Sequence, residues 1–122
     1  MKARFRVLAA GAALAAGLSG IAAPPASAAL HDCPWGKVCF WNDAGFTGDL
    51  SWSRPGIGLM NISARNNDKL SSIWNNSGWA AAFYDHAGGG GACLTVAPGQ
   101  RFHYVGDWIN DRVSSWKTNG GC

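Results

Sequence analysis

Short runs of Val, Phe, Trp, Tyr and Ile alternate with clusters of Gly, Pro, Asn and Asp along the chain after residue 33. No stretch keeps apolar residues at i, i+3, i+4 and i+7 for three turns, so the pattern argues against helices. Short β-branched and aromatic runs bounded by turn residues are typical of strands. The pattern predicts strands at residues 38–41, 49–53, 70–75, 81–84, 92–96, 101–105 and 113–117.

The two halves of this region repeat each other at a fixed offset of 43 residues. The motif Asn-Asp-x-x-Ser-Ser occurs at residues 67–72 and again at residues 110–115. The same offset superimposes Phe40 on Phe83, Gly45 on Gly88, Gly48 on Gly91 and Pro55-Gly56 on Pro98-Gly99, without a gap. A period of about 20–50 residues is typical of a duplicated supersecondary unit. We therefore expect an all-β fold in which two units form a small antiparallel sandwich.

The first 28 residues have the pattern of a secretory signal peptide. A basic start is followed by an apolar stretch and by the small-residue cleavage sequence Ala26-Ser27-Ala28. The apolar stretch is short and broken by glycines, so a retained membrane helix is the weaker interpretation. We expect a secreted single domain at residues 29–122, with repeats at about 36–78 and 79–122 and no membrane contact after cleavage.

Charge excludes one class of partner. The formal charge of +3 comes from the three basic residues of the leader. The remainder balances Lys and Arg against Asp, contains no Glu, and intersperses the signs. Such a chain offers no basic face for nucleic acid. We expect a monomer.

Four cysteines in an exported chain of this size favour disulfides. Three pairings are open, and we favour Cys33–Cys39 with Cys93–Cys122. The first pair encloses the turn-forming run Pro34-Trp35-Gly36, and the second would tie the C-terminus to the second repeat. The alternative, a metal site of four thiolates, lacks the spacing of paired C-x-x-C knuckles.

The hairpin motif Trp41-x-x-x-x-Phe46-x-Gly48, followed by Asn-Asp-x-x-Ser-Ser, resembles the Greek-key motif of the βγ-crystallin superfamily. The resemblance implies a βγ-crystallin-like sandwich of two Greek keys, with Ser72 and Ser115 pinning the hairpins. The second repeat departs from the motif, because Gly89 replaces the second aromatic residue. That hairpin should be looser.

The same resemblance implies weak calcium binding by both loops. Calcium prefers about six to eight hard oxygen ligands, and one carboxylate per loop predicts a Kd of about 10⁻⁵–10⁻³ M. Each site would take groups from both motifs, with a hairpin carbonyl near Asn42 or Asp85. The alternative is that these side chains only cap turns. The implied ligands are Asn67, Asp68, Lys69 (carbonyl), Ser71, Asn110, Asp111, Arg112 (carbonyl) and Ser114.

The opening sequence Cys33-Pro34-x-Gly36-x-x-Cys39-Phe40-Trp41 is similar to the start of a secreted bacterial peptidase-inhibitor family with this fold, which includes metalloproteinase inhibitors. The resemblance implies a non-enzymatic protein whose partner is an extracellular protease. Catalysis has little support of its own, because His31, His86 and His103 fit no hydrolase spacing and no Glu is present.

Tryptophan and loop positions suggest where a partner would bind. Trp52, Trp74 and Trp108 align with Thr95, Lys117 and Arg65 of the other repeat, which indicates solvent exposure. Trp116 aligns with Ile73 and should lie in the core, and Trp41 aligns with Tyr84 and should belong to the hairpin scaffold. Leu94, beside Cys93, is a candidate for an inhibitory loop or equally for a buried strand.

The alternative function is a calcium-stabilised glycan-binding or antimicrobial module, similar to killer-toxin-like relatives of the fold. In that case Trp74 or Trp108 would contact the glycan.

Overall fold

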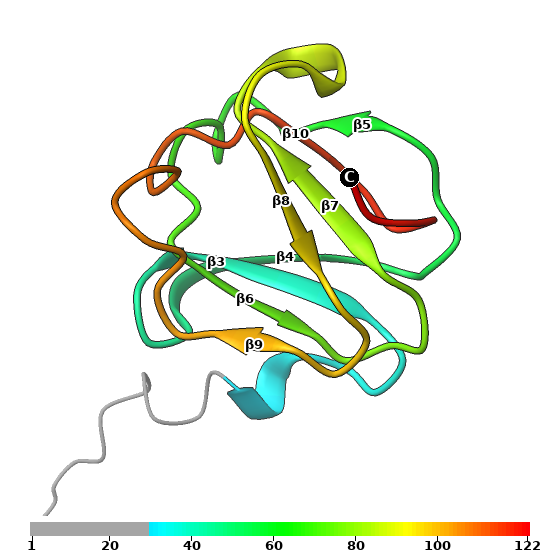
Figure 1. Cartoon of the computed structure of the whole chain (residues 1–122). Coiled ribbons are helices and arrows are strands. Elements are labelled where there is room, and N and C mark those ends of the chain that lie inside the picture. The colour runs from blue at the N-terminus through cyan, green and yellow to red at the C-terminus, as the bar shows by residue number, and fades with distance from the viewer. Residues whose placement is uncertain (1–29) are drawn as a thin grey trace, which may run out of the picture.

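The computed structural model describes residues 30–122, and the predicted signal peptide at residues 1–28, with its cleavage boundary, lies outside the described residues. Two four-stranded antiparallel sheets, ordered β4-β3-β6-β9 and β5-β10-β7-β8, pack as a sandwich (Figure 1). The strands are β3 (Val38–Asp43), β4 (Thr47–Ser53), β5 (Met60–Asn61), β6 (Ser72–Asn75), β7 (Ala81–Tyr84), β8 (Cys93–Val96), β9 (Arg101–Phe102) and β10 (Ser115–Lys117). The all-β sandwich is confirmed.

Each sheet borrows one short strand from the other repeat. β9 of the second repeat pairs with β6 of the first, and β5 of the first pairs with β10 of the second. Reciprocal hydrogen bonds accompany the exchange: Val105 N–H donates to the Ser71 carbonyl and Ile62 N–H to the Ser114 carbonyl, both at 2.9 Å. These pairs are related by the offset of 43 residues, so the gapless repeat is a structural pseudo-symmetry.

Strand ends follow from these tertiary bonds. The prediction for residues 81–84 matches β7, and β3 and β4 are longer than predicted. The predicted strand at 101–105 is too long, because Val105 bonds to the opposite loop instead of a strand. The predicted strands at 70–75 and 113–117 begin two residues early. A 3-10 turn at residues 30–32 and the 3-10 helix η3 (Ala87–Gly89) are the helical segments of residues 30–122.

Aromatic side chains form the centre of the core. Phe40, Phe83 and Trp116 meet between the sheets, with ring centroids 5.1–6.0 Å apart. Trp116 and its repeat equivalent Ile73 are both buried, as predicted. Burying apolar surface contributes about 25 cal/mol per Å², so this cluster is a main source of stability.

Serine side chains pin both hairpins. Ser72 Oγ accepts from Phe46 N–H at 3.0 Å and donates to the Asp43 carbonyl at 2.7 Å. Ser115 Oγ accepts from Gly89 N–H and donates to the His86 carbonyl, at positions shifted by 43 residues. The predicted role of both serines is confirmed.

The two hairpins differ as the sequence indicates. Trp41 packs edge-on against Phe46 with centroids 5.2 Å apart. Gly89 occupies the equivalent position in the second hairpin with φ of +82°, and no ring covers Tyr84 there. The first hairpin therefore gains aromatic packing that the second lacks.

Two disulfides staple the domain, with the pairing that the sequence favoured. Cys33–Cys39 closes a short loop and Cys93–Cys122 ties the C-terminus to β8. Cys33, Cys39 and Trp41 form a second small apolar cluster, against which Leu30, Phe46, Leu50 and Trp74 pack. Among residues 30–122, no helix is long and apolar enough to cross a membrane.

Candidate functional site

The two Asn-Asp-x-x-Ser-Ser loops lie against each other at one end of the sandwich. Asp68 N–H donates to the Val113 carbonyl and Asp111 N–H donates to the Leu70 carbonyl, both at 3.1 Å. Both aspartates have left-handed backbone, with φ of 60° and 58°. This conformation is uncommon outside Gly, Asn and Asp, which explains why these residue types stand here.

Each aspartate faces a serine of the other loop. Ser114 Oγ donates to Asp68 Oδ1 at 3.0 Å, and Ser71 Oγ donates to Asp111 Oδ1 at 3.3 Å. The hairpins complete the arrangement, since Ser71 N–H bonds to the Trp41 carbonyl and Ser114 N–H to the Tyr84 carbonyl. The loops therefore make two equivalent oxygen clusters, each with groups from both repeats.

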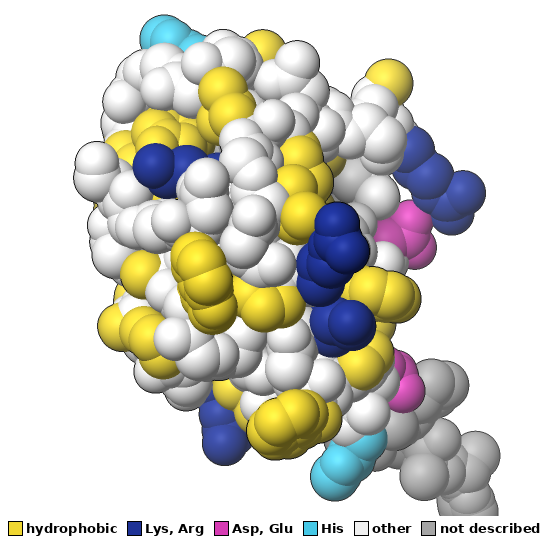
Figure 2. Space-filling view, turned by 90° about the vertical axis from the view of Figure 1, so that its right-hand side faces the viewer, with side chains coloured by type: hydrophobic (Ala, Val, Ile, Leu, Met, Phe, Trp, Pro, Cys, Tyr) yellow, Lys and Arg dark blue, Asp and Glu magenta, His cyan; other side chains and the backbone are white. Residues whose placement is uncertain are grey.

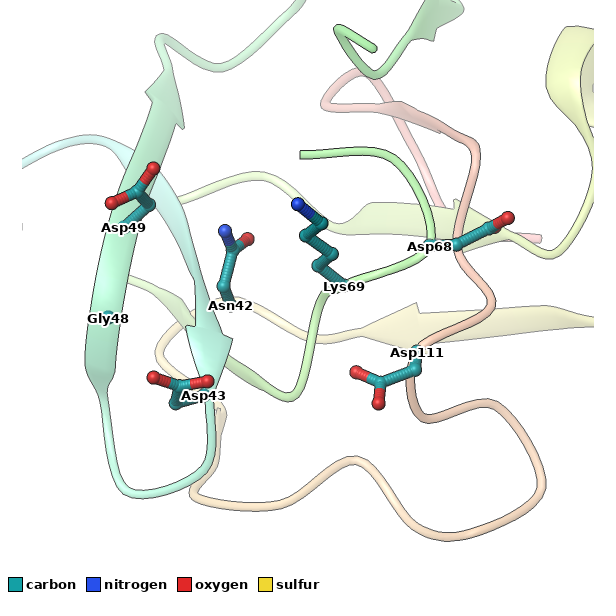
Figure 3. A pocket seen from close by; sticks show the side chains of 7 residues that line it. All are labelled: Asn42, Asp43, Gly48, Asp49, Asp68, Lys69 and Asp111. Carbon is teal, nitrogen blue, oxygen red and sulfur yellow. The ribbon is translucent and has the colours of Figure 1, made fainter. Parts of the chain in front are cut away.

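We call the Asp111–Ser71 pair the first cluster and the Asp68–Ser114 pair the second. An open pocket of about 420 Å³ lies beside the first cluster. In Figure 3 the carboxylate of Asp111 points into this pocket, while that of Asp68 points away from it. The aspartates thus serve separate clusters, one beside the first hairpin and one beside the second. The pocket is lined by Asn42, Asp43, Gly48, Asp49, Asp68, Lys69 and Asp111.

The donor set suits a hard cation. The Oδ1 atoms of Asn42 and Asn110 are buried without a hydrogen-bond partner. Buried polar atoms are nearly always paired, so these two carbonyl oxygens could accept a cation or water. Among residues 30–122, no three His, Cys, Asp or Glu side chains gather as a metal site. Neutral oxygens would therefore have to supply most ligands.

Two neighbouring cations affect the pocket. Lys69 lines it, and its own carbonyl oxygen lies 3.5 Å from Ser71 Oγ. Arg65 is paired with Asp49 at 3.0 Å on the exposed rim. These charges reduce the negative potential that would attract a cation, which favours weak binding.

The remaining loop residues contribute less directly. Asn67 is half-buried in the first loop. The guanidinium of Arg112 donates to the Trp108 carbonyl at 2.9 Å and so braces its own loop. In the same loop, the hydrogen bond that Tyr104 donates to Asp107 raises the pKa of the exposed Tyr104 phenol.

The tryptophans predicted to be exposed divide into two groups. Trp52 and Trp108 are exposed, whereas Trp74 is half-buried, with the Arg101 guanidinium 4.9 Å above its ring. Leu94 is also half-buried and packs against the core from β8, at the edge of its sheet. The location of Leu94 fits the structural alternative better than an inhibitory contact.

Two further tryptophans, which the sequence pattern did not single out, are also exposed. Trp35 is 90% exposed and Trp79 is 52% exposed. The repeat carries a signal for both, because Trp35 aligns with Gly78 and Trp79 with Gly36. Both lie at the end of the sandwich opposite the Asn-Asp loops, in turns that bond to each other.

Comparison with known proteins places this geometry among βγ-crystallin folds. A domain from Clostridium beijerinckii is 27% identical over 66% of this chain and 93% of its own, with a TM-score of 0.56. A domain from Flavobacterium johnsoniae is 26% identical over 70% and 98%, with a TM-score of 0.57. The βγ-crystallin of Ciona intestinalis is 24% identical over 69% and 100%, with a TM-score of 0.56.

Comparison of the sequence with protein-family profiles identifies a specific family within this fold. Residues 26–96 match the profile of peptidase inhibitor family I36. No curated protein sequence matches the chain significantly.

Proposed function

Because the chain belongs to peptidase inhibitor family I36, we propose that it is secreted and inhibits an extracellular metallopeptidase. The family match supports the inhibitory role and a protease as the partner. The two disulfides support an oxidising compartment, because such bonds persist outside the reducing cytosol. The choice of metallopeptidases rests on the similarity of the opening Cys33 to Trp41 segment to inhibitors of that class.

The architecture supports inhibition by a rigid surface. A binding protein loses less conformational entropy when its contact residues are already ordered. Here both termini of residues 33–122 are held by disulfides, and reciprocal hydrogen bonds fix the loops at both ends. A surface held in this way can occupy the substrate cleft of a peptidase without changing its conformation.

A comparison of protease classes tests this function. Oxidised protein comprising residues 29–122 is incubated with a thermolysin-like metallopeptidase and, separately, with a subtilisin-like serine peptidase. We expect inhibition of the metallopeptidase only. Inhibition of the serine enzyme alone would contradict the proposed class, and inhibition of neither would contradict the function.

We propose further that calcium binds the two Asp–Ser clusters. In the first, Asp111, Ser71 and the Lys69 carbonyl would hold the ion; in the second, Asp68, Ser114 and the Arg112 carbonyl. Asn67 and Asn110 contribute side-chain oxygens. Support comes from the reciprocal Asp–Ser pairs and from the unpartnered oxygens of Asn42 and Asn110. The ion would supply a crosslink between the repeats.

Thermal unfolding of the inhibitor alone tests calcium binding, since a thermolysin-like enzyme itself depends on metal ions. With a Kd of about 10⁻⁴ M, 10 mM calcium at one site stabilises by about 2.7 kcal/mol. That corresponds to roughly 10–20 °C in Tm for a domain of this size. Asp111→Asn should reduce this shift, while Asp107→Asn in the same region should retain it. An unchanged Tm in 10 mM calcium would contradict the assignment.

A further inference from the structure

Five turns meet at the end of the sandwich opposite the Asn-Asp loops, and we call this surface the turn end. Backbone hydrogen bonds connect them: Gly36 N–H to the Asn76 carbonyl, Gly99 N–H to the Asn75 carbonyl, and Gly120 N–H to the Ala80 carbonyl, at 2.8–3.1 Å. Gly56 N–H joins the last turn through the Thr118 carbonyl at 2.7 Å. The five segments are residues 34–37, 54–57, 75–80, 97–101 and 117–120.

Charge distinguishes the turn end from the rest of the surface. Its five segments contain Lys37, Arg54, Arg101 and Lys117 and no Asp or Glu. Figure 2 shows this side of the molecule: basic and hydrophobic side chains gather on it, and acidic side chains are confined to one margin. The loops of the opposite end carry Asp43, Asp68, Asp85, Asp107 and Asp111 against Lys69 and Arg112. One end of the molecule is therefore cationic although its net charge is near zero, which corrects the expectation that balanced charges leave no basic face.

The turn end also presents the most exposed large apolar side chain of the described residues. Trp35 is 90% exposed at the tip of the loop closed by Cys33–Cys39. Its backbone is nonetheless held in place, because Asn76 donates from Nδ2 to the Pro34 carbonyl and from N–H to the Lys37 carbonyl. The loop therefore presents to solvent an indole that buries little of its surface against its own domain.

Other aromatic side chains extend this surface. Trp79 is 52% exposed and lies in the turn to which the Trp35 loop is hydrogen-bonded. Trp52 is 51% exposed, and Lys37 Nζ lies 5.3 Å from the centre of its ring. A single exposed tryptophan needs no explanation, but three on adjoining segments of one cationic surface are typical of an interaction site.

Resting on the proposed inhibitory function, we propose that the turn end is the surface that contacts the peptidase, with Trp35 as its anchor. The partner surface has an apolar pocket for the indole and acidic residues around it, because the rim of the turn end is cationic. Tryptophan is enriched among residues that dominate binding energy. The disulfide and the bonds to Asn76 hold the loop before binding, so little ordering entropy is lost.

Inhibition constants of variants test the assignment against the thermolysin-like metallopeptidase. Trp35→Ala should raise the inhibition constant at least about 30-fold, the effect of removing one hot-spot side chain. Trp35→Phe should restore part of the loss. The control is Leu59→Ala, because Leu59 is an apolar side chain that is 48% exposed and lies beside Gly89, away from the turn end. This control should inhibit like the wild type.

A second arm examines the cationic rim. Lys37→Glu should slow association with the peptidase, and the rate for the wild-type protein should fall as salt concentration rises. Circular dichroism and Tm verify that each variant folds, which is expected because none of the altered side chains is buried.

The outcomes separate this inference from the function on which it rests. If the wild-type protein inhibits no peptidase, both are overturned. If the wild-type protein inhibits and Trp35→Ala inhibits equally well, the inhibitory function stands and the assignment of the turn end as the contact surface is overturned. Loss of glycan binding by that variant would not rescue the assignment. A loss with Trp35→Ala and none with Leu59→Ala supports the assignment.

Discussion

Replacement of the hairpin serine Ser72 by alanine tests the account of the fold most sharply. The Ser72 hydroxyl is fully buried and makes two short hydrogen bonds, one from Phe46 N–H and one to the Asp43 carbonyl. Phe46 has a φ of 62°, an uncommon backbone state for an aromatic residue. The serine therefore holds a hairpin that its own sequence would not maintain.

The expected loss of stability can be estimated from the two hydrogen-bond partners of the Ser72 hydroxyl. Leaving the partly buried Phe46 N–H without an acceptor costs about 1–3 kcal/mol. The Asp43 carbonyl belongs to an exposed residue, can bind water, and loses only about 0.5–1.5 kcal/mol. Together Ser72→Ala should reduce the free energy of unfolding by about 2–3 kcal/mol, or roughly 10–20 °C in Tm.

The assay is thermal unfolding followed by circular dichroism in a calcium chelator. Ser71→Ala is the matched control, because the neighbouring hydroxyl makes only long bonds of 3.3 and 3.5 Å. It should cost less than about 1 kcal/mol. Equal losses for the two variants would refute the argument that the hairpin depends on Ser72.

Two further predictions concern backbone strain and ionisation. Gly48 has φ of +83°, and a Cβ there would lie 2.6 Å from Asp43 Oδ2, so Gly48→Ala should destabilise by about 1–3 kcal/mol in chemical denaturation. Gly58→Ala should be nearly neutral, because a Cβ there would make only an ordinary contact, 3.8 Å from Asn119 Nδ2. Equal stability of the two variants would contradict this. The Tyr104 phenol donates to Asp107, which favours the neutral form and raises its pKa, so Asp107→Asn should lower the pKa of Tyr104 toward its usual value near 10. Phenolate absorbance measured against pH checks the shift, and an unchanged titration would contradict it.

Much of the fold could be predicted because the repeat has no gap. An offset of 43 residues that aligns Asn67 to Ser72 with Asn110 to Ser115 requires equivalent hydrogen bonds in both halves, and these are observed at Ser72 and Ser115. The disulfide pairing was favoured correctly because Pro34 to Gly36 forms a short turn between Cys33 and Cys39.

The exchange of strands was beyond the sequence pattern. β5 contains only Met60 and Asn61, too short to show a period of two. Strand ends at Ser72 and Ser115 depend on bonds between the loops, which local propensity does not contain.

The candidate site could likewise be predicted from the sequence only in part. Asp68 and Asp111 lie in facing loops, as the resemblance implied, but the pairing of each with Ser114 and Ser71 required the structure. Trp35 was missed because its exposure depends on a turn held by Asn76, far along the chain.

Active-site titration of a thermolysin-like metallopeptidase with the oxidised protein tests the central claim most directly. A fixed micromolar concentration of enzyme is mixed with increasing inhibitor, and residual hydrolysis of a small peptide is recorded. A peptidase inhibitor of family I36 that acts on this class should remove activity linearly and reach zero at one molecule per enzyme. Full activity at a molar excess of folded, disulfide-bonded protein would contradict the claim.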